Sequence, residues 1–246
     1  MKNWLIYYPI ERLLAHWTDI LVTINKEDYQ RAKSFHLRGN GKLVLHPGVG
    51  VNIRNFQNVM IDRDEKRAEL GVTNKTVFVT VGELIDRKNQ DILLDAMKFL
   101  SDKGAVLLIA GDGRNAGKLK LRIEKEGLLD TVKLLGYRTD VGELLKAADC
   151  FVFPSLQEGL PGALMEAMAS GLPCIASNIR GNSDVLDDSN FLFDPKDCER
   201  LVTLMDRMLS LETRTLEADK NKKRVKKFDI SEAIAAYKKV YQDCIK

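Results

Sequence analysis

Two glutamates, Glu158 and Glu166, stand with seven residues between them around a Gly-Leu-Pro turn. Glu158 follows an apolar run at 150–153 that predicts a buried strand, and Glu166 lies about one turn into the helical pattern that begins at Gly162. This spacing lets both carboxylates face one pocket above the loop. Because a carboxylate accepts hydrogen bonds from a vicinal diol, the pair predicts recognition of sugar hydroxyls.

The turn between the glutamates suits an anion. Gly159, Leu160 and Pro161 lead from the predicted strand into the start of a helix. Backbone N–H groups and the positive end of the helix dipole stabilise a phosphate there without a basic side chain. The alternative, that the two glutamates are ordinary helix and loop residues, stays open at this point.

Three further motifs follow predicted strands in order: Val81–Leu84 with Arg87–Asn89, then Ile109–Gly113, then Leu135–Asp140. Together with the E-x7-E spacing they resemble the retaining glycosyltransferases of the GT-B fold, of the family-4 or group 1 type. Among these the chain is similar to bacterial exopolysaccharide and capsule transferases. The resemblance covers residues 4–244.

The resemblance implies a nucleotide-sugar donor site. Its residues would be Gly82, Arg87, Lys88, Gly111, Tyr137, Arg138, Glu158, Gly159, Leu160, Pro161 and Glu166. Lys88 and Glu158 would be catalytic, since charge growing on a departing diphosphate is stabilised by positive potential fixed beforehand. Glu166 would bind the ribose. The donor, expected to be a UDP-sugar, is a substrate, and neither a cofactor nor a metal is expected.

The chain departs from the family in two places. The family has an arginine directly after Gly82, where this chain has Glu83, although it keeps the lysine at Lys88. The family's catalytic histidine and glycine-rich donor loop, which belong to its N-terminal domain, are not found. A non-catalytic nucleotide-sugar-binding fragment, or one half of a split transferase, is therefore the alternative.

The aromatic residues Trp4, Tyr7 and Trp17 near the N-terminus favour a partner for such a half, because an uncovered apolar patch tends to be an interaction site. A nucleotide-sugar epimerase is a third reading, which the Gly-Leu-Pro turn between the glutamates disfavours. An NAD site is disfavoured because no G-x-G-x-x-G opens the first helix of the domain.

The composition and net charge limit the classes of molecule that the chain is expected to bind. The chain has 246 residues, is 45% hydrophobic and 30% charged, and carries a net charge of +3, which is too small to argue for nucleic acid. The expected partners are the nucleotide sugar and a glycan or lipid-linked acceptor. An N-terminal half or a second copy of the chain remains open.

The distribution of cysteines and charges bears on location. Four widely spaced cysteines predict reduced thiols, and no signal peptide or long apolar run is present, so a cytoplasmic protein is expected. The basic run Lys220–Lys227 is interpreted as a solvated helix face, with peripheral contact at the inner face of the cell membrane as the alternative. Three scattered histidines support neither a metal cluster nor a Ser-His-Asp arrangement.

Short apolar runs alternate with helical patterns from residue 62 onward, which predicts an α/β fold with a Rossmann-like, doubly wound parallel sheet. In the terms of the resemblance this is the C-terminal donor-binding domain of a GT-B fold with a remnant of the N-terminal domain. The expected divisions are residues 1–46 for the remnant, 47–52 for a hinge, 53–227 for the donor-binding domain and 228–246 for a C-terminal helix.

Overall fold

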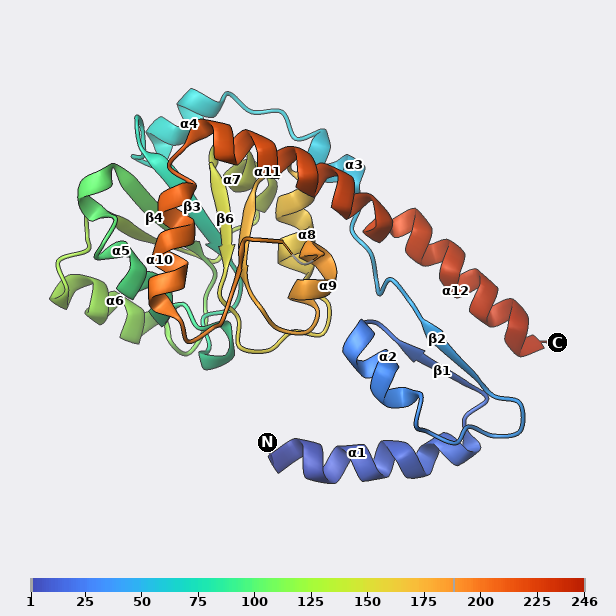
Figure 1. The fold of residues 1–246 in the computed structure, drawn as a ribbon. Helices are drawn as coiled ribbons and strands as arrows, with labels where there is room; N and C mark the ends of the chain where they lie inside the picture. The colour runs from blue at the N-terminus through green and yellow to red at the C-terminus, as the bar shows by residue number, and fades with distance from the viewer. Residues whose placement is uncertain (1, 188, 246) are drawn as a thin grey trace. The chain divides into compact units, whose positions relative to one another are not determined.

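A six-stranded parallel sheet, in the order β5-β4-β3-β6-β7-β8, forms the centre of the larger of two units in the computed structural model (Figure 1). The structure describes residues 2–187 and 189–245, and the side chains of residues 7–187 and 189–244. The larger unit is Val51–Lys226, and the smaller unit combines Met1–Gly50 with Lys227–Lys246.

The strands are short and most are buried on both faces. They are β3 (Thr76–Val81), β4 (Ala105–Ala110), β5 (Val132–Gly136), β6 (Cys150–Phe153), β7 (Cys174–Ser177) and β8 (Leu192–Phe193). Every residue of β4, β6 and β7 is buried. Parallel strands covered by helices on both faces have continuous apolar sequences, which explains why these runs predicted the sheet. The α/β, doubly wound fold predicted from the sequence is confirmed.

Helices cover both faces of this sheet. They are α3 (Ile53–Gln57), α4 (Arg63–Glu69), α5 (Asp91–Met97), α6 (Ala116–Lys125), α7 (Val141–Ala147), α8 (Gly162–Ala169), α9 (Asn182–Leu186), α10 (Cys198–Arg207) and α11 (Leu211–Arg224). Side chains of α5, α6 and α10 share one hydrophobic cluster with β3, β4 and β6. Helix α7 contacts β3, helix α8 contacts β6 and β7, and helix α9 contacts β7.

The direction of winding reverses between β3 and β6. From β3 the chain adds β4 and then β5 on one side, and it returns to add β6, β7 and β8 on the other. Strands β3 and β6 are neighbours, with Phe78 opposite Cys150 and Val79 opposite Phe151. Doubly wound sheets bind ligands at the carboxyl ends of the strands beside such a reversal, so the loops after β3 and β6 are where a site is expected.

The smaller unit contains α1 (Lys2–Leu14), β1 (Ile20–Thr23), α2 (Lys26–Ala32), β2 (Lys42–Leu45) and α12 (Ile230–Ile245). Helix α1 continues through Pro9. Strands β1 and β2 are parallel. The buried His46 joins the two ends of the chain, since its Nε2 lies 3.2 Å from the carbonyl oxygen of Ala233 in α12.

Apolar side chains are exposed on the first helix and the turn after it. Tyr7 is 60% exposed and Trp17 is 67% exposed, while the side chain of Trp4 lies outside the described residues. Among the described residues, no helix has the length and apolarity needed to span a membrane.

Candidate functional site

The loops after β3 and β6 are tied together across the reversal of the sheet. The N–H of Leu156 donates to the carbonyl oxygen of Arg87 at 2.8 Å. The side-chain amide of Asn89 donates to the carbonyl oxygens of Pro154 at 3.1 Å and Pro195 at 3.0 Å. Asn89 has a left-handed backbone, with φ of 56°, which asparagine tolerates better than most residues. These bonds hold the turn that carries the two cations against the loop that carries Glu158.

An ion pair joins the two predicted catalytic residues at this point. Lys88 Nζ lies 2.7 Å from Glu158 Oε1, and only 15% and 8% of the two side chains are exposed. The ammonium also lies 4.8 Å from the ring centroid of Phe153. The more exposed Arg87 places Nη1 3.9 Å from Glu158 Oε2 and donates to the carbonyl oxygen of Gln157 at 3.3 Å. Two cations therefore share one carboxylate, which leaves a net positive cluster.

Two glycines, Gly82 and Gly111, lie at the ends of the neighbouring strands β3 and β4. A Cβ atom on Gly111 would lie 1.9 Å from the carbonyl oxygen of Gly82, and the Gly82 N–H donates to the carbonyl oxygen of Ala110 at 3.0 Å. Gly82 also adjoins the Lys88 side chain, because a Cβ there would lie 3.7 Å from Lys88 Cε. Glu83, at the family's arginine position, is exposed. The absence of a side chain at Gly111 allows the ends of β3 and β4 to approach closely, and the absence of one at Gly82 leaves room for the Lys88 side chain.

The first amides of helix α8 have no recorded hydrogen-bond partner within residues 2–187 and 189–245. Pro161 is its buried N-cap and no described side chain caps the helix. The Met165 N–H makes the first bond back, to the carbonyl oxygen of Pro161 at 3.2 Å, so the N–H groups of residues 162–164 are available to an external acceptor. Gly159 is exposed and Leu160 half-buried just before them. This end of the helix can bind an anion beside the Lys88 ammonium.

Glu166 lies half-buried on α8. Within the described part of the chain its carboxylate has no recorded hydrogen-bond or ion-pair partner, and burial raises its pKa above the usual value. Its acceptor capacity is thus free for a ligand that brings donors, as a diol does.

Tyr137 and Arg138, which were also predicted to bind the donor, have no recorded contact with the Arg87–Lys88–Glu158 cluster among the described residues. Tyr137 is 79% exposed. Arg138 makes two bonds to Asp140, Nε to Oδ1 at 2.7 Å and Nη2 to Oδ2 at 2.6 Å. Lys66 also contacts Asp140, at 2.8 Å. The Arg138 guanidinium and Lys66 hold the pKa of Asp140 well below its usual value. The Arg138 side chain is therefore committed to an ion-pair network between α4 and α7.

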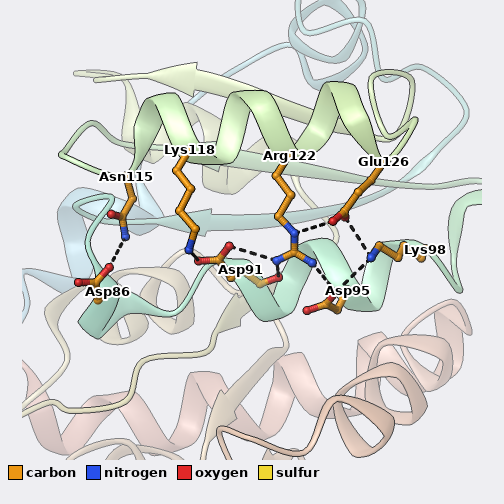
Figure 2. A network of polar contacts seen from close by, with 8 residues as sticks. All are labelled: Asp86, Asp91, Asp95, Lys98, Asn115, Lys118, Arg122 and Glu126. Atoms are coloured by element: carbon orange, nitrogen blue, oxygen red, sulfur yellow. Dashed lines mark hydrogen bonds and ion pairs between the residues drawn. The ribbon is translucent and has the colours of Figure 1, made fainter.

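A second polar network, which sequence reasoning did not detect, holds the turn that carries the cations (Figure 2). One set of its contacts joins α5 to α6 through Asp91, Asp95, Lys98, Lys118, Arg122 and Glu126. Separately, at the site end, the Asn115 side chain donates to Asp86 Oδ1 at 2.8 Å, and Arg114 Nη2 lies 2.6 Å from Asp86 Oδ2. Asp86 directly precedes Arg87 and Lys88, so these two contacts hold the turn that carries the cations.

The short helix α9 lies next to the turn between the two glutamates. It is formed by residues 182–186, and the preceding Gly181 has φ of 81°. A Cβ on Gly181 would lie 2.4 Å from the carbonyl oxygen of Gly159. Five residues carry too little periodicity for the sequence to reveal such a helix, and only the glycine was a signal. Among the described side chains, no group of His, Cys, Asp or Glu could hold a metal ion.

Two curated relatives are similar to this chain in sequence. A putative glycosyltransferase EpsD of Bacillus subtilis is 37% identical over 192 residues, which are 76% of this chain and 50% of the relative. A UDP-Gal:α-D-GlcNAc-diphosphoundecaprenol α-1,3-galactosyltransferase of Escherichia coli is 30% identical over 98% of this chain and 64% of its own length. The chain thus spans between half and two thirds of these relatives.

Solved structures agree on the fold. Anabaena HepE in complex with UDP and glucose superposes with a TM-score of 0.80 over 96% of this chain and 66% of its own, at 21% identity. The family model described as "Glycosyl transferases group 1" matches residues 62–227, which contain both glutamates, the cation turn and α8. On this match and on the geometry of the site, the chain belongs to the group 1 glycosyltransferases.

Proposed function

We propose that this chain is a retaining glycosyltransferase that takes its sugar from a UDP-sugar, which it binds in the unit Val51–Lys226. The observation that supports this best is the Lys88–Glu158 pair, which bridges the reversal of the sheet beside the uncapped start of α8. A cation and a row of amides without a recorded partner among the described residues suit a diphosphate, and the Glu158 carboxylate beside the cation suits a sugar hydroxyl.

The ion pair suggests how the site responds to the donor. Without a diphosphate, Lys88 is neutralised by Glu158 at 2.7 Å. When the diphosphate arrives at the start of α8, Lys88 turns toward it, and Glu158 is free to accept a hydrogen bond from the transferred sugar. The Glu166 carboxylate then accepts hydrogen bonds from both hydroxyls of the ribose. As the bond to the sugar breaks, the Lys88 charge and the α8 amides stabilise the negative charge that grows on the departing diphosphate.

The relatives support the proposed donor and acceptor. The name of the Escherichia coli relative specifies UDP-galactose and a lipid-linked diphosphate acceptor, and the HepE structure contains UDP and glucose. We therefore propose a UDP-sugar donor and a glycan or lipid-linked acceptor, in assembly of a cell-surface polysaccharide on the cytoplasmic side of the membrane. The site is proposed to work without cofactor or metal, because Lys88 and α8 supply the positive potential.

A second candidate is a nucleotide-sugar-binding half that turns over only with a separate N-terminal half. Its support is that Tyr7 and Trp17 are exposed, since exposed aromatic side chains are typical of an interaction surface.

The test is calorimetric titration of the purified chain with UDP, GDP and ADP, followed by a UDP-sugar hydrolysis assay on the same sample. We expect UDP to bind more tightly than the other two nucleotides. Binding with slow hydrolysis supports the first candidate, and binding without turnover supports the second. A folded sample that binds none of the three nucleotides refutes both.

The role of position 83 has its own test. Replacing Glu83 by Arg restores the residue type that the family has there, and we expect it to tighten UDP binding, since an exposed cation next to Gly82 attracts the diphosphate. Titration of Glu83→Arg beside Glu83→Gln separates the gain of a positive charge from the loss of a negative one. Equal UDP affinity in all three proteins would show that residue 83 faces away from the phosphates.

A further inference from the structure

Asn182, the first residue of α9, is fully buried behind the loop that carries Glu158. The residue before it, Gly181, presses on that loop: a Cβ there would lie 2.4 Å from the carbonyl oxygen of Gly159 and 3.4 Å from Pro161 Cδ. The start of α9 therefore forms the support on which the turn between the two glutamates rests.

Hydrogen bonds connect Asn182 to the same loop. Its side-chain amide donates to the carbonyl oxygen and to Oγ of Ser177, both at 3.1 Å. The Ser177 hydroxyl in turn donates to the carbonyl oxygen of Ser155, three residues before Glu158. Ser155 and Ser177 are both fully buried. Asn182 thus orients the Ser177 hydroxyl, and that hydroxyl sets where the chain leaves β6 toward Glu158.

Two buried polar atoms near Asn182 lack a hydrogen-bond partner in the part of the chain that the structure describes, unlike those of another buried asparagine, Asn221. Asn182 Oδ1 and Ser155 Oγ are buried without a hydrogen-bond partner among the described residues. Asn221 on α11 is equally buried, but both ends of its amide are paired: Nδ2 donates to the carbonyl oxygen of Leu172 at 3.1 Å, and Oδ1 accepts from Arg224 at 3.1 Å. Unsatisfied buried groups are rare, and two of them lie here on the residues at either end of the contacts from Asn182 through Ser177 to Ser155.

We propose that Asn182 is a positioning residue of the donor site, which acts through Ser177 to hold the Glu158–Pro161 loop and the first amides of α8 in place for the diphosphate. The inference rests on the proposed function, since it requires the diphosphate to lie at that loop. Asn182 itself does not touch the donor. A displaced loop would cost binding to the phosphate nearest α8 and leave the rest of the nucleotide unaffected.

The experiment compares UDP with UMP, which lacks the second phosphate, by calorimetric titration of the full chain. We expect Asn182→Ala to weaken UDP binding by about tenfold, equivalent to about 1.4 kcal/mol, and to leave UMP binding within about twofold. Ser177→Ala should reproduce the loss. The double variant should lose no more than the larger single loss, because both substitutions break one chain of contacts.

Asn221→Ala is the matched control, since it removes an equally buried asparagine that has no contact with the loop. It should lower the thermal midpoint as Asn182→Ala does, yet keep the ratio of UDP to UMP affinity. If Asn182→Ala leaves that ratio unchanged, the residue is structural only and the inference fails while the proposed function stands. If Asn182→Ala does not fold, an unchanged ratio in Ser177→Ala overturns the inference instead. If the unaltered chain binds neither UDP nor UMP, the proposed function and this inference are both refuted.

Discussion

Substitution of Glu166 should change nucleotide affinity and stability in opposite directions. Its carboxylate is half-buried and, within the described part of the chain, has no recorded partner, so the protein carries a desolvated charge that nothing compensates. A ligand diol would supply the missing donors. We expect Glu166→Ala to weaken UDP binding by about 1–3 kcal/mol, which is about 5- to 150-fold in the dissociation constant.

The stability effect follows from the sign of the pKa shift. Burial raises the pKa of Glu166, so the folded state holds the proton to a higher pH than the unfolded chain does. The contribution of Glu166 is therefore present at low pH and is lost as the pH rises through the raised pKa. Glu166→Gln, which stays neutral, should raise the thermal midpoint at pH 7, and the difference from the unaltered chain should disappear below about pH 4.

The assay pairs calorimetric titration with UDP and thermal unfolding at several pH values. Glu124→Gln on the exposed end of α6 is the control, since its side chain is exposed and far along the helix from the strand ends that carry the site. A Glu166→Ala protein with unchanged UDP affinity would remove this residue from the site. A Glu166→Gln protein that is less stable at pH 7 would show that the carboxylate has a stabilising partner in solution.

Three further substitutions test the neighbouring contacts. Lys88→Met should abolish the preference for UDP over UMP and lower the free energy of unfolding by about 3 kcal/mol in urea, because it leaves Glu158 buried with only the more distant Arg87 as a partner. Adding Glu158→Gln to this variant should restore the stability but not the binding of UDP. Asp140→Asn should lower stability at pH 7 by about 1–3 kcal/mol, and thermal unfolding should show the difference shrinking as the pH falls below about 4, since ion pairs depress the pKa of this carboxyl. Gly111→Ala should cost about 1–3 kcal/mol by the same unfolding assay, because its Cβ would overlap the carbonyl oxygen of Gly82.

The sequence alone determined the class of fold and the order of the motifs. Continuous apolar runs such as Ala105–Ala110 and Cys150–Phe153 favour burial on both faces, and their alternation with helical patterns indicates a parallel sheet covered by helices. The spacing of Glu158 and Glu166 likewise placed both on the segment from β6 to α8, because strand, turn and helix have fixed lengths. Local pattern was sufficient wherever the determining contacts lie within one segment.

Only the tertiary structure decided which charges meet. Arg138 and Lys88 both follow strands in the sequence, yet the first is held by Asp140 and the second pairs with Glu158, 70 positions along the chain. The reversal of the sheet brings the loops after β3 and β6 together, and that order of strands is not written in any local pattern. The support of the site loop by Gly181 and Asn182 was hidden for the same reason, since a close approach between two backbones depends on the packing of distant segments.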